Sequence, residues 1–203
     1  MPQYWPVTLT EGRVTLRPLR VRDEAEWHQI RRGASEWFRP WDATKPGGSK
    51  ETPLNFAQMV RRNRTQAKMG RMLPWAVCYE STLGQESVFA GQLTVSGIAH
   101  GSASWGMIGY WISPRWAGRG IIPLAVAMAC DYCFQELGLH RLEIAIRPEN
   151  GNSLAVARKV GFRHEGLRQR YMHVAGDWRD HEMFALHSEE VPSGVVKRLL
   201  TGD

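Results

Sequence analysis

The chain has 203 residues, of which 43% are hydrophobic and 23% charged, and its formal net charge is +6. These fractions are typical of a globular protein and exclude a disordered, collagen-like or low-complexity chain. The longest nearly apolar stretch, residues 121–130, has about half of the roughly 20 residues that a membrane-spanning helix needs.

Three cysteines cannot all pair, and the N-terminus has no basic region followed by an apolar one. We therefore expect a cytoplasmic protein in a reducing compartment, with no membrane partner. The basic balance, 26 Lys and Arg against 20 Asp and Glu, favours an anionic partner such as a phosphorylated cofactor, RNA or an acidic protein. A solvated basic surface explains the same balance equally well.

The first half of the chain predicts two helices between strands. Residues 13–20 alternate apolar and polar side chains, as in a strand. Asp23 is placed to cap a helix that runs to about Gly33, and the turn residues of 39–50 indicate a loop. Thr52 and Pro53 predict the start of a second helix, which is basic over residues 54–71.

The second half predicts an antiparallel meander followed by alternating helices and strands. The meander comprises residues 75–79, 88–98 and 104–112, and a strongly apolar helix follows from residue 121 to Gly138. Then come a strand at 142–146, a helix that Asn150 or Asn152 caps, and two strands within 162–186.

This order predicts an α/β (α+β) fold: a mixed, mostly antiparallel sheet of about seven strands flanked by four helices. We expect one domain over residues 1–203, with a core at about 13–188 and a short tail at 189–203.

The segment 113–120 reads Ser-Pro-Arg-Trp-Ala-Gly-Arg-Gly and lies between a predicted strand and the most apolar helix. Small residues let backbone N–H groups approach an anion, and the positive end of the helix dipole points to the same place. Arg115 and Arg119 would add positive charge. A plain tight turn is the alternative interpretation, and the glycine spacing fits neither a P-loop nor a dinucleotide-binding fingerprint.

In this context the spacing of Arg115, Gly118 and Gly120 resembles the GNAT family of N-acetyltransferases, and within it the branch that acetylates ribosomal-protein alanines. Similar residues are spread over most of the chain, at 39–42, 109–112, 140–141, 150, 153, 161–162, 165–166 and 176–181.

The resemblance implies that acetyl-CoA binds as co-substrate and that no metal is required. The pyrophosphate is expected on the amides from Trp116 to Ile121, and the pantetheine arm beside a strand that splays from its neighbour. The residues implied for acetyl-CoA are Tyr110, Trp111, Ile112, Arg115, Trp116, Ala117, Gly118, Arg119, Gly120, Ile121 and Asn150.

The resemblance also implies direct attack by an amine, with the Ile112 amide stabilising the oxyanion. Ser153 is the candidate proton donor to the thiolate; its alternative role is a hydroxyl that caps a helix start. The base is open, because the positions that carry one in other members hold Met172 and Ala145 here. Asp180 and Asp42 are candidate replacements, and a structural or substrate-binding role is the alternative for each.

The acceptor is expected between a front loop, residues 37–50, and the last hairpin, with Trp41, Asp42 and Tyr171 as wall residues. Since no strong base is evident, an N-terminal α-amine is favoured, and the resemblance points to the N-terminal alanine of a ribosomal protein. Association with the ribosome, and a monomer or a homodimer, remain open. The alternatives are a small amine or antibiotic as acceptor, or a non-catalytic acyl-CoA sensor.

Two further features have plain interpretations. Cys130 and Cys133 lie within the apolar helix, which favours buried core residues over a zinc or redox pair. The cluster from Arg61 to Arg71 would suit RNA or an acidic substrate, whereas a solvated helix face is the commoner meaning of such a charge run.

Overall fold

The computed structural model describes residues 5–47, 52–82, 84 and 86–202. These residues contain one eight-stranded sheet in the order β1-β2-β3-β4-β5-β6-β8-β7. All neighbouring strands are antiparallel except β5 and β6, which are parallel. The strands are β1 (Leu9–Glu11), β2 (Val14–Pro18), β3 (Leu73–Tyr79), β4 (Val88–Ala99), β5 (Trp105–Ile112), β6 (Arg141–Ile146), β7 (Arg163–Val174) and β8 (Asp177–His187).

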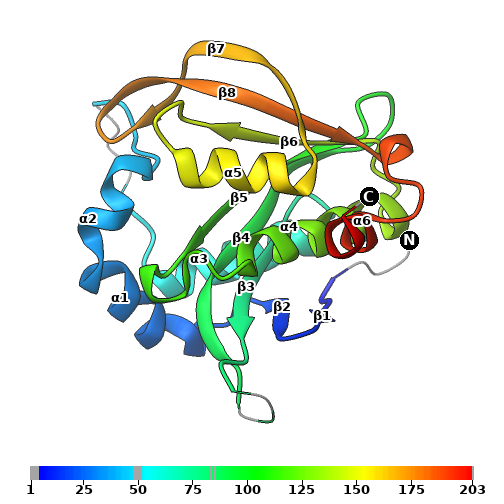
Figure 1. Cartoon of the computed structure of the whole chain (residues 1–203). Helices are drawn as coiled ribbons and strands as arrows, with labels where there is room; N and C mark the ends of the chain where they lie inside the picture. Colours follow the sequence, from blue (N-terminus) through cyan, green and yellow to red (C-terminus); the bar gives the residue numbers. More distant parts are fainter. Residues whose placement is uncertain (1–4, 48–51, 83, 85, 203) are drawn as a thin grey trace.

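Helices cover both faces of this sheet (Figure 1). The α-helices of the described residues are α1 (Glu24–Gly33), α2 (Ser35–Phe38), α3 (Phe56–Lys68), α4 (Ile121–Asp131), α5 (Gly151–Val160) and α6 (Val195–Thr201). A π-helical turn, Tyr132–Glu136, extends α4 almost to Gly138, where the sequence predicts its end. None of the described helices is both long enough and apolar enough to cross a bilayer.

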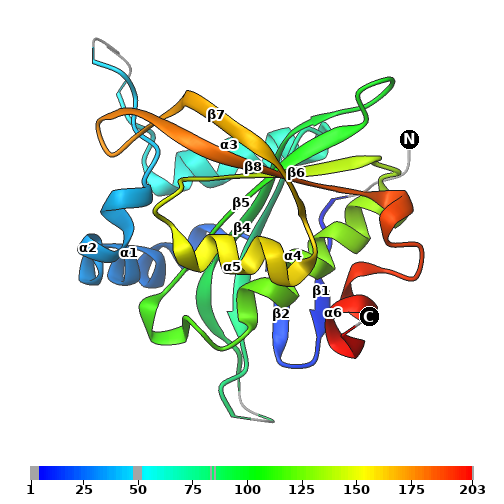
Figure 2. The same ribbon diagram turned by 45° about the horizontal axis from the view of Figure 1, so that its top comes forward.

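Two hydrophobic clusters hold the layers together. The larger one packs α4, α5 and α6 on one face of the sheet and includes Trp75 and Leu142, both with no exposed surface. The smaller one packs α1 and α3 on the other face through Phe56 and Val60. Figure 2 shows α4 and α5 on the opposite side of the sheet from α3. Packing on both faces of the sheet therefore holds the central strands, β5 and β6 among them, in place.

The α/β (α+β) class and the mostly antiparallel sheet are confirmed, but both element counts were too low. The described residues form eight strands and six α-helices instead of about seven and four. Strand β1 has three residues, too few for an alternating pattern to be recognised. The segment expected to be a tail carries α6, whose Val195 is fully buried and whose amides at 195 and 196 donate to the Asp131 carboxylate.

The predicted start of the basic helix at Thr52–Pro53 was wrong. Helix α3 begins at Phe56, because Asn55 and Gln58 form a capping box. The Asn55 side chain accepts from the Gln58 amide (2.9 Å), and the Gln58 side chain accepts from the Asn55 amide (3.0 Å). This reciprocal pair satisfies two amides at the start of the helix and fixes its first residue at Phe56.

The front loop is more ordered than its turn residues indicate. Its first part is a 3-10 turn, Arg39–Trp41, and Ala43 forms an isolated bridge with Val174 at the tip of the last hairpin. The Thr44 amide donates to the carbonyl oxygen of His173 (2.9 Å). Residues 48–50 of the predicted loop lie outside the described residues. The front segment and the hairpin are thus tied together by backbone contacts.

Candidate active site

The sheet opens between β5 and β6. These strands are hydrogen-bonded only where residues 105–107 face residues 141–143. Beyond that point β5 stays with β4 as far as the Gly91–Ile112 pair, and β6 stays with β8 as far as the Ile146–Glu182 pair. Figure 1 shows the two strands diverging. The splay implied for residues 110–112 is therefore present, and it leaves a strand edge that an extended ligand can pair with.

Ile112 presents its backbone groups to this opening. The next amide, that of Ser113, donates to the carbonyl oxygen of Ala90 on β4 (2.8 Å). Successive strand residues direct their amides to alternate edges, so the Ile112 amide points away from β4. Its carbonyl faces the same way and accepts from Nε1 of Trp37 (3.2 Å). The Ile112 amide is therefore directed into the opening, where it can donate to an oxygen that gains negative charge.

The loop between β5 and α4 supplies a row of free amides. Gly118 (φ 75°) and Gly120 (φ 76°) have left-handed backbone conformations, which side chains disfavour, and Gly120 is the N-cap of α4. The amides of residues 118–122 have no hydrogen-bond acceptor in the described part of the chain. Because they also lie at the positive end of the α4 dipole, this loop is suited to an anion.

Two amides expected to bind the pyrophosphate are already used. The Trp116 amide donates to the carbonyl oxygen of Ser113 (2.9 Å), and the Ala117 amide donates to that of Pro114 (3.3 Å). Both bonds belong to the 3-10 turn Pro114–Trp116 and its C-cap. The free row therefore begins at Gly118, later than the sequence indicates, and reaches Ile122.

The two arginines of the loop flank the cleft without lining it. Arg115 and Arg119 are exposed, and their guanidinium groups lie 4.8 and 5.2 Å from the ring centroid of Trp116. Trp116 itself is buried and packs against Tyr79, with ring centroids 5.4 Å apart. This indole thus holds two positive charges beside the free amides, an arrangement that favours a polyphosphate.

A cleft of about 880 Å³ joins this loop, the β5–β6 opening and the start of α5. Most of the predicted site residues line it, namely Trp41, Asp42, Tyr110, Trp111, Ile112, Trp116, Ala117, Gly118, Gly120, Ile121, Asn150 and Ser153. The predicted residues outside its lining are Arg115, Arg119, Tyr171 and Asp180. The cleft therefore gathers residues of the front segment, of the chain from β5 into α4 and of the start of α5 into one site.

Asn150 caps α5, which settles one open alternative. Its Oδ1 accepts from the Ser153 amide (3.2 Å), and Asn152 does not serve as the cap. The Ser153 hydroxyl is therefore not the capping group, and it has no hydrogen-bond partner among the described residues. Because Ser153 lines the cleft, this hydroxyl is available to a ligand.

Tyr110 fixes the start of α5 against β5. Its hydroxyl donates to the carbonyl oxygen of Ser153 (3.5 Å). Burial raises the pKa of Tyr110 to about 12, so the phenol stays protonated at neutral pH. Tyr110 therefore acts here as a hydrogen-bond donor and not as a base.

An arginine of α1 holds one end of the front wall, which we define as residues 37–42. Arg31 pairs with Asp42 (2.6 Å), and its guanidinium lies 4.3 Å from the ring centroid of Phe38 and 5.5 Å from that of Trp111. Arg31 thus contacts both Asp42, which is expected to face the acceptor, and Trp111 of β5, the strand expected to bind the cofactor. Arg31 does not stand out in the sequence, because a single arginine on a short helix has no distinctive local pattern.

A second arginine, Arg147, holds the middle of the front wall from the end of β6. It donates to the carbonyl oxygen of Pro40 (2.6 Å), pairs with Glu149 (3.1 Å) and lies 5.5 Å from the ring centroid of Trp41. Only 13% of its side chain is exposed. Because Trp41 lines the cleft and Arg147 does not, Arg147 acts as a positioning residue for the wall.

The two predicted site residues of the last hairpin, Asp180 and Tyr171, contact other residues of that hairpin and do not line the cleft. Asp180 accepts from the Arg170 amide (2.8 Å), at a residue with φ of 49° where the β7–β8 register shifts. Tyr171 packs against His181 with ring centroids 5.9 Å apart. His181 is buried, and burial lowers its pKa, so its imidazole is neutral at pH 7. In this arrangement the Asp180 carboxylate stabilises the hairpin backbone.

The cysteine interpretation is confirmed. Cys130 and Cys133 have no exposed surface, and burial raises the pKa of both thiols, so neither is a reactive thiolate. Within the described ranges, no cluster of three or more His, Cys, Asp or Glu residues is arranged to hold a metal ion.

Comparison with known proteins places the chain in a family. The model of the acetyltransferase (GNAT) domain matches residues 13–163, a span that contains the split strands, the loop and the start of β7. A solved structure of Mycobacterium smegmatis RimJ in complex with CoA-disulfide superposes with a TM-score of 0.86. It is 37% identical and the match covers 100% of this chain and 97% of that one.

Two curated relatives differ in how much they share. The [ribosomal protein uS5]-alanine N-acetyltransferase of Escherichia coli is 29% identical over 93% of this chain and 94% of its own length. The probable N-acetyltransferase YjcK of Bacillus subtilis is 35% identical, but the match covers 47% of this chain and spans about half of that protein, 53%.

Proposed function

The chain belongs to the GNAT family of acetyltransferases, and from that premise we propose that it transfers the acetyl group of acetyl-CoA to the N-terminal α-amine of a protein. The favoured acceptor is the N-terminal alanine of a ribosomal protein. The observation that carries the proposal is the joining, in one cleft, of a free strand edge, a row of free amides and the Ser153 hydroxyl. The full-length similarity to a CoA-bound RimJ supports the same assignment.

The residues present fit acetyl-CoA. The free amides of residues 118–122 and the charges of Arg115 and Arg119 would hold the pyrophosphate. The edge of β5 at residues 110–112 would pair with the amides of the pantetheine arm, and Asn150 retains a side-chain NH₂ group for the same arm. Acetyl-CoA supplies an activated thioester, and the chain supplies its placement.

Two groups of the chain would assist the transfer. The Ile112 amide, directed into the opening, would donate to the thioester oxygen as negative charge develops on it. The Ser153 hydroxyl would give its proton to the departing thiolate sulfur and regain one, through solvent, from the amine nitrogen as the amide forms. Each role requires a group that has no other partner, and the arrangement of both groups meets that requirement.

An α-amine suits a cleft without a strong base. Its pKa of about 7.7–8.0 leaves part of it neutral near pH 7, whereas a lysine side chain, with a pKa of about 10.4, would need a base. The carboxylate expected nearest the acceptor, Asp42, lines the cleft and is held in place by Arg31, so it is positioned to pair with an incoming ammonium group. We therefore assign Asp42 to binding of the amine and leave Asp180 in the hairpin.

The test uses the purified protein with acetyl-CoA and three acceptors. These are a short peptide that begins with alanine, the same peptide with a blocked N-terminus and an internal lysine, and spermidine. We expect thiol release with the first peptide alone, and mass spectrometry should place the acetyl group on its α-amine. Turnover on spermidine alone would instead assign a small-amine acceptor.

Two further outcomes would contradict the proposal. Thermal protection by acetyl-CoA without turnover on any amine would indicate a sensor. No protection at millimolar acetyl-CoA would remove both enzyme and sensor. If turnover on the alanine peptide is found, N-terminal proteomics of cells with and without the protein would identify the acceptor, and a ribosomal protein is the expected result.

A further inference from the structure

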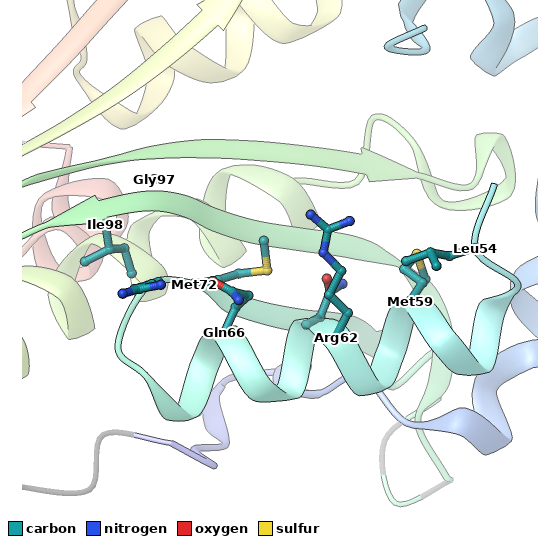
Figure 3. Close-up of a pocket in the computed structure, with 9 residues that line it drawn as sticks. Leu54, Met59, Arg62, Gln66, Met72, Gly97 and Ile98 are labelled. Carbon is teal, nitrogen blue, oxygen red and sulfur yellow. The ribbon is translucent and has the colours of Figure 1, made fainter. Parts of the chain in front are cut away.

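A second hollow lies on the side of the sheet that carries α3, away from the cleft. It has a volume of about 580 Å³ and is open to solvent between α3, the start of β3 and the end of β4. Figure 3 shows Met59, Arg62 and Gln66 rising from α3 toward the strand that carries Gly97 and Ile98. We call this hollow the α3 groove, and its lining is Leu54, Met59, Arg62, Asn63, Gln66, Arg71, Met72, Gly97 and Ile98.

The α3 groove and the cleft share no lining residue. The groove lies at Gly97 on β4, whereas the cleft lies at Ile112, which pairs with Gly91 on the same strand. Six strand residues, or about 20 Å, separate the two positions. A ligand in the α3 groove would therefore leave the cofactor and acceptor positions open.

The charged side chains that line the α3 groove are all positive. The chain from Leu54 to Tyr79 contains five cationic residues and no Asp or Glu. The five are Arg61, Arg62, Arg64, Lys68 and Arg71, and no ion pair joins any of them to a carboxylate in the described part of the chain. Arg62 and Arg71 line the groove. Two exposed guanidinium groups without an internal partner favour a ligand with carboxylates or phosphates.

Apolar side chains line much of the rest of the α3 groove and favour a peptide with carboxylates over a nucleic acid with phosphates. Leu54 is 47% exposed at one end, and the thioether side chains of Met59 and Met72 line the middle. Unbranched methionines adapt to apolar side chains of a partner. The groove has no aromatic residue on which a base could stack, which is the usual means of binding single-stranded RNA.

We propose that the α3 groove is a docking site for a peptide segment that alternates acidic and apolar side chains, bound apart from the cleft. Its carboxylates would pair with Arg62 and Arg71, and its apolar side chains would cover Leu54, Met59 and Met72. Asn63 and Gln66 would hydrogen-bond to the backbone of the segment. The proposal does not depend on the transferase activity.

The helix offers a matched control. The lining positions 59, 62, 63 and 66 recur at helical spacing and form one stripe of α3, and Arg61 and Arg64 lie on another side of the same helix. Replacing either pair of arginines by glutamate changes the net charge equally. The groove pair is Arg62→Glu with Arg71→Glu, and the control pair is Arg61→Glu with Arg64→Glu.

The experiment measures fluorescence anisotropy of a labelled peptide that alternates glutamate and leucine and is blocked at both ends, so that it is not an acceptor. We expect saturable binding that weakens as salt rises. The groove pair should reduce the affinity by about tenfold or more, and the control pair by less than about twofold. A peptide with serine in place of leucine should bind several-fold more weakly.

Folding of each variant is checked by its thermal protection by acetyl-CoA, and Arg62→Gln with Arg71→Gln provides a milder version of the groove pair. Equal losses in both charge-reversed pairs would overturn the proposal in favour of diffuse attraction. Absence of peptide binding to the unmodified protein would overturn it outright. Tighter binding of a labelled oligouridine, abolished by the groove pair, would reassign the groove to RNA.

Discussion

The two halves of the cleft are built in different ways. The half proposed for the cofactor offers mainly main-chain groups from one continuous segment, the edge of β5 and the amides of residues 118–122. The half proposed for the acceptor is walled by side chains of residues 37–42, which Arg31 from α1 and Arg147 after β6 hold in place. Main-chain groups change only when the backbone changes, whereas side-chain contacts change with single substitutions. This difference fits a family with one co-substrate and many acceptors.

The largest expected effect breaks the cofactor half. Gly118→Glu places a carboxylate beside the free amides and forces a left-handed φ of 75° on a side chain. Repulsion between like charges costs several kcal/mol, so the affinity for acetyl-CoA should fall by about 1,000-fold in calorimetry. Gly12→Glu is the control, because Gly12 also has a positive φ (51°) and open space but lies in the β1–β2 turn. Equal losses in both variants would refute anion binding by the loop.

The next effect lies where the two halves meet. Ser153→Ala removes the proposed proton donor and should lower kcat by about 100-fold while leaving the dissociation constant of acetyl-CoA unchanged. Ser153→Thr keeps a hydroxyl and should recover part of the rate. Steady-state kinetics and calorimetry on both variants separate the two quantities. An unchanged kcat in Ser153→Ala would show that solvent supplies the proton.

A smaller effect breaks only the acceptor half. Arg147→Gln loses the charge that holds Pro40, Trp41 and Glu149, so we expect the KM for the acceptor peptide to rise by about tenfold with acetyl-CoA affinity unchanged. Arg39→Gln is the control in the same wall, because the Arg39 side chain is 74% exposed and pairs with exposed Glu36. A loss of acetyl-CoA affinity in Arg147→Gln would mean that the halves are not separable.

The smallest expected effect is at Glu165, outside both halves of the cleft, and it concerns the stability of the fold and not ligand binding. The Arg141 guanidinium beside Glu165 lowers the pKa of that carboxyl from 4.5 to about 2. The folded state therefore binds this proton more weakly than the unfolded state. The stability it contributes is present above about pH 4.5 and is lost as the pH falls toward about 2.

Glu165→Gln should accordingly lower the free energy of unfolding by about 1 kcal/mol near pH 7, a figure reduced for solvent screening, with the difference vanishing near pH 2. Urea unfolding at both pH values measures it. The acetyl-CoA affinity and acceptor KM should stay unchanged. A constant difference at all pH values would show that the ion pair with Arg141 does not stabilise the fold.

The same contrast explains what the sequence could predict. The strands, the helix from residue 121 and the glycine loop follow from periodicity and turn chemistry within short windows, and so does the cap of α5. Contacts such as Arg147 to Pro40 join residues 107 positions apart, and no local pattern encodes them. Short elements were missed for a related reason: β1 has three residues and α2 has four.

The amides of Trp116 and Ala117 show a third limit. The sequence identifies the loop, but only the backbone conformation shows that Pro114 starts a 3-10 turn, which uses those two amides and moves the free row to Gly118. For Ser153 the backbone conformation has the opposite consequence: Asn150 makes the capping bond, so the Ser153 hydroxyl is left free for a ligand.

A crystal structure with CoA and an alanine-initiated peptide would test the central claim most directly. It should show the pyrophosphate accepting hydrogen bonds from the amides of residues 118–122, the pantetheine arm paired with β5, and the peptide N-terminus near Asp42 and Trp41. Phosphates held elsewhere, with the β5–β6 opening occupied by the peptide alone, would contradict it.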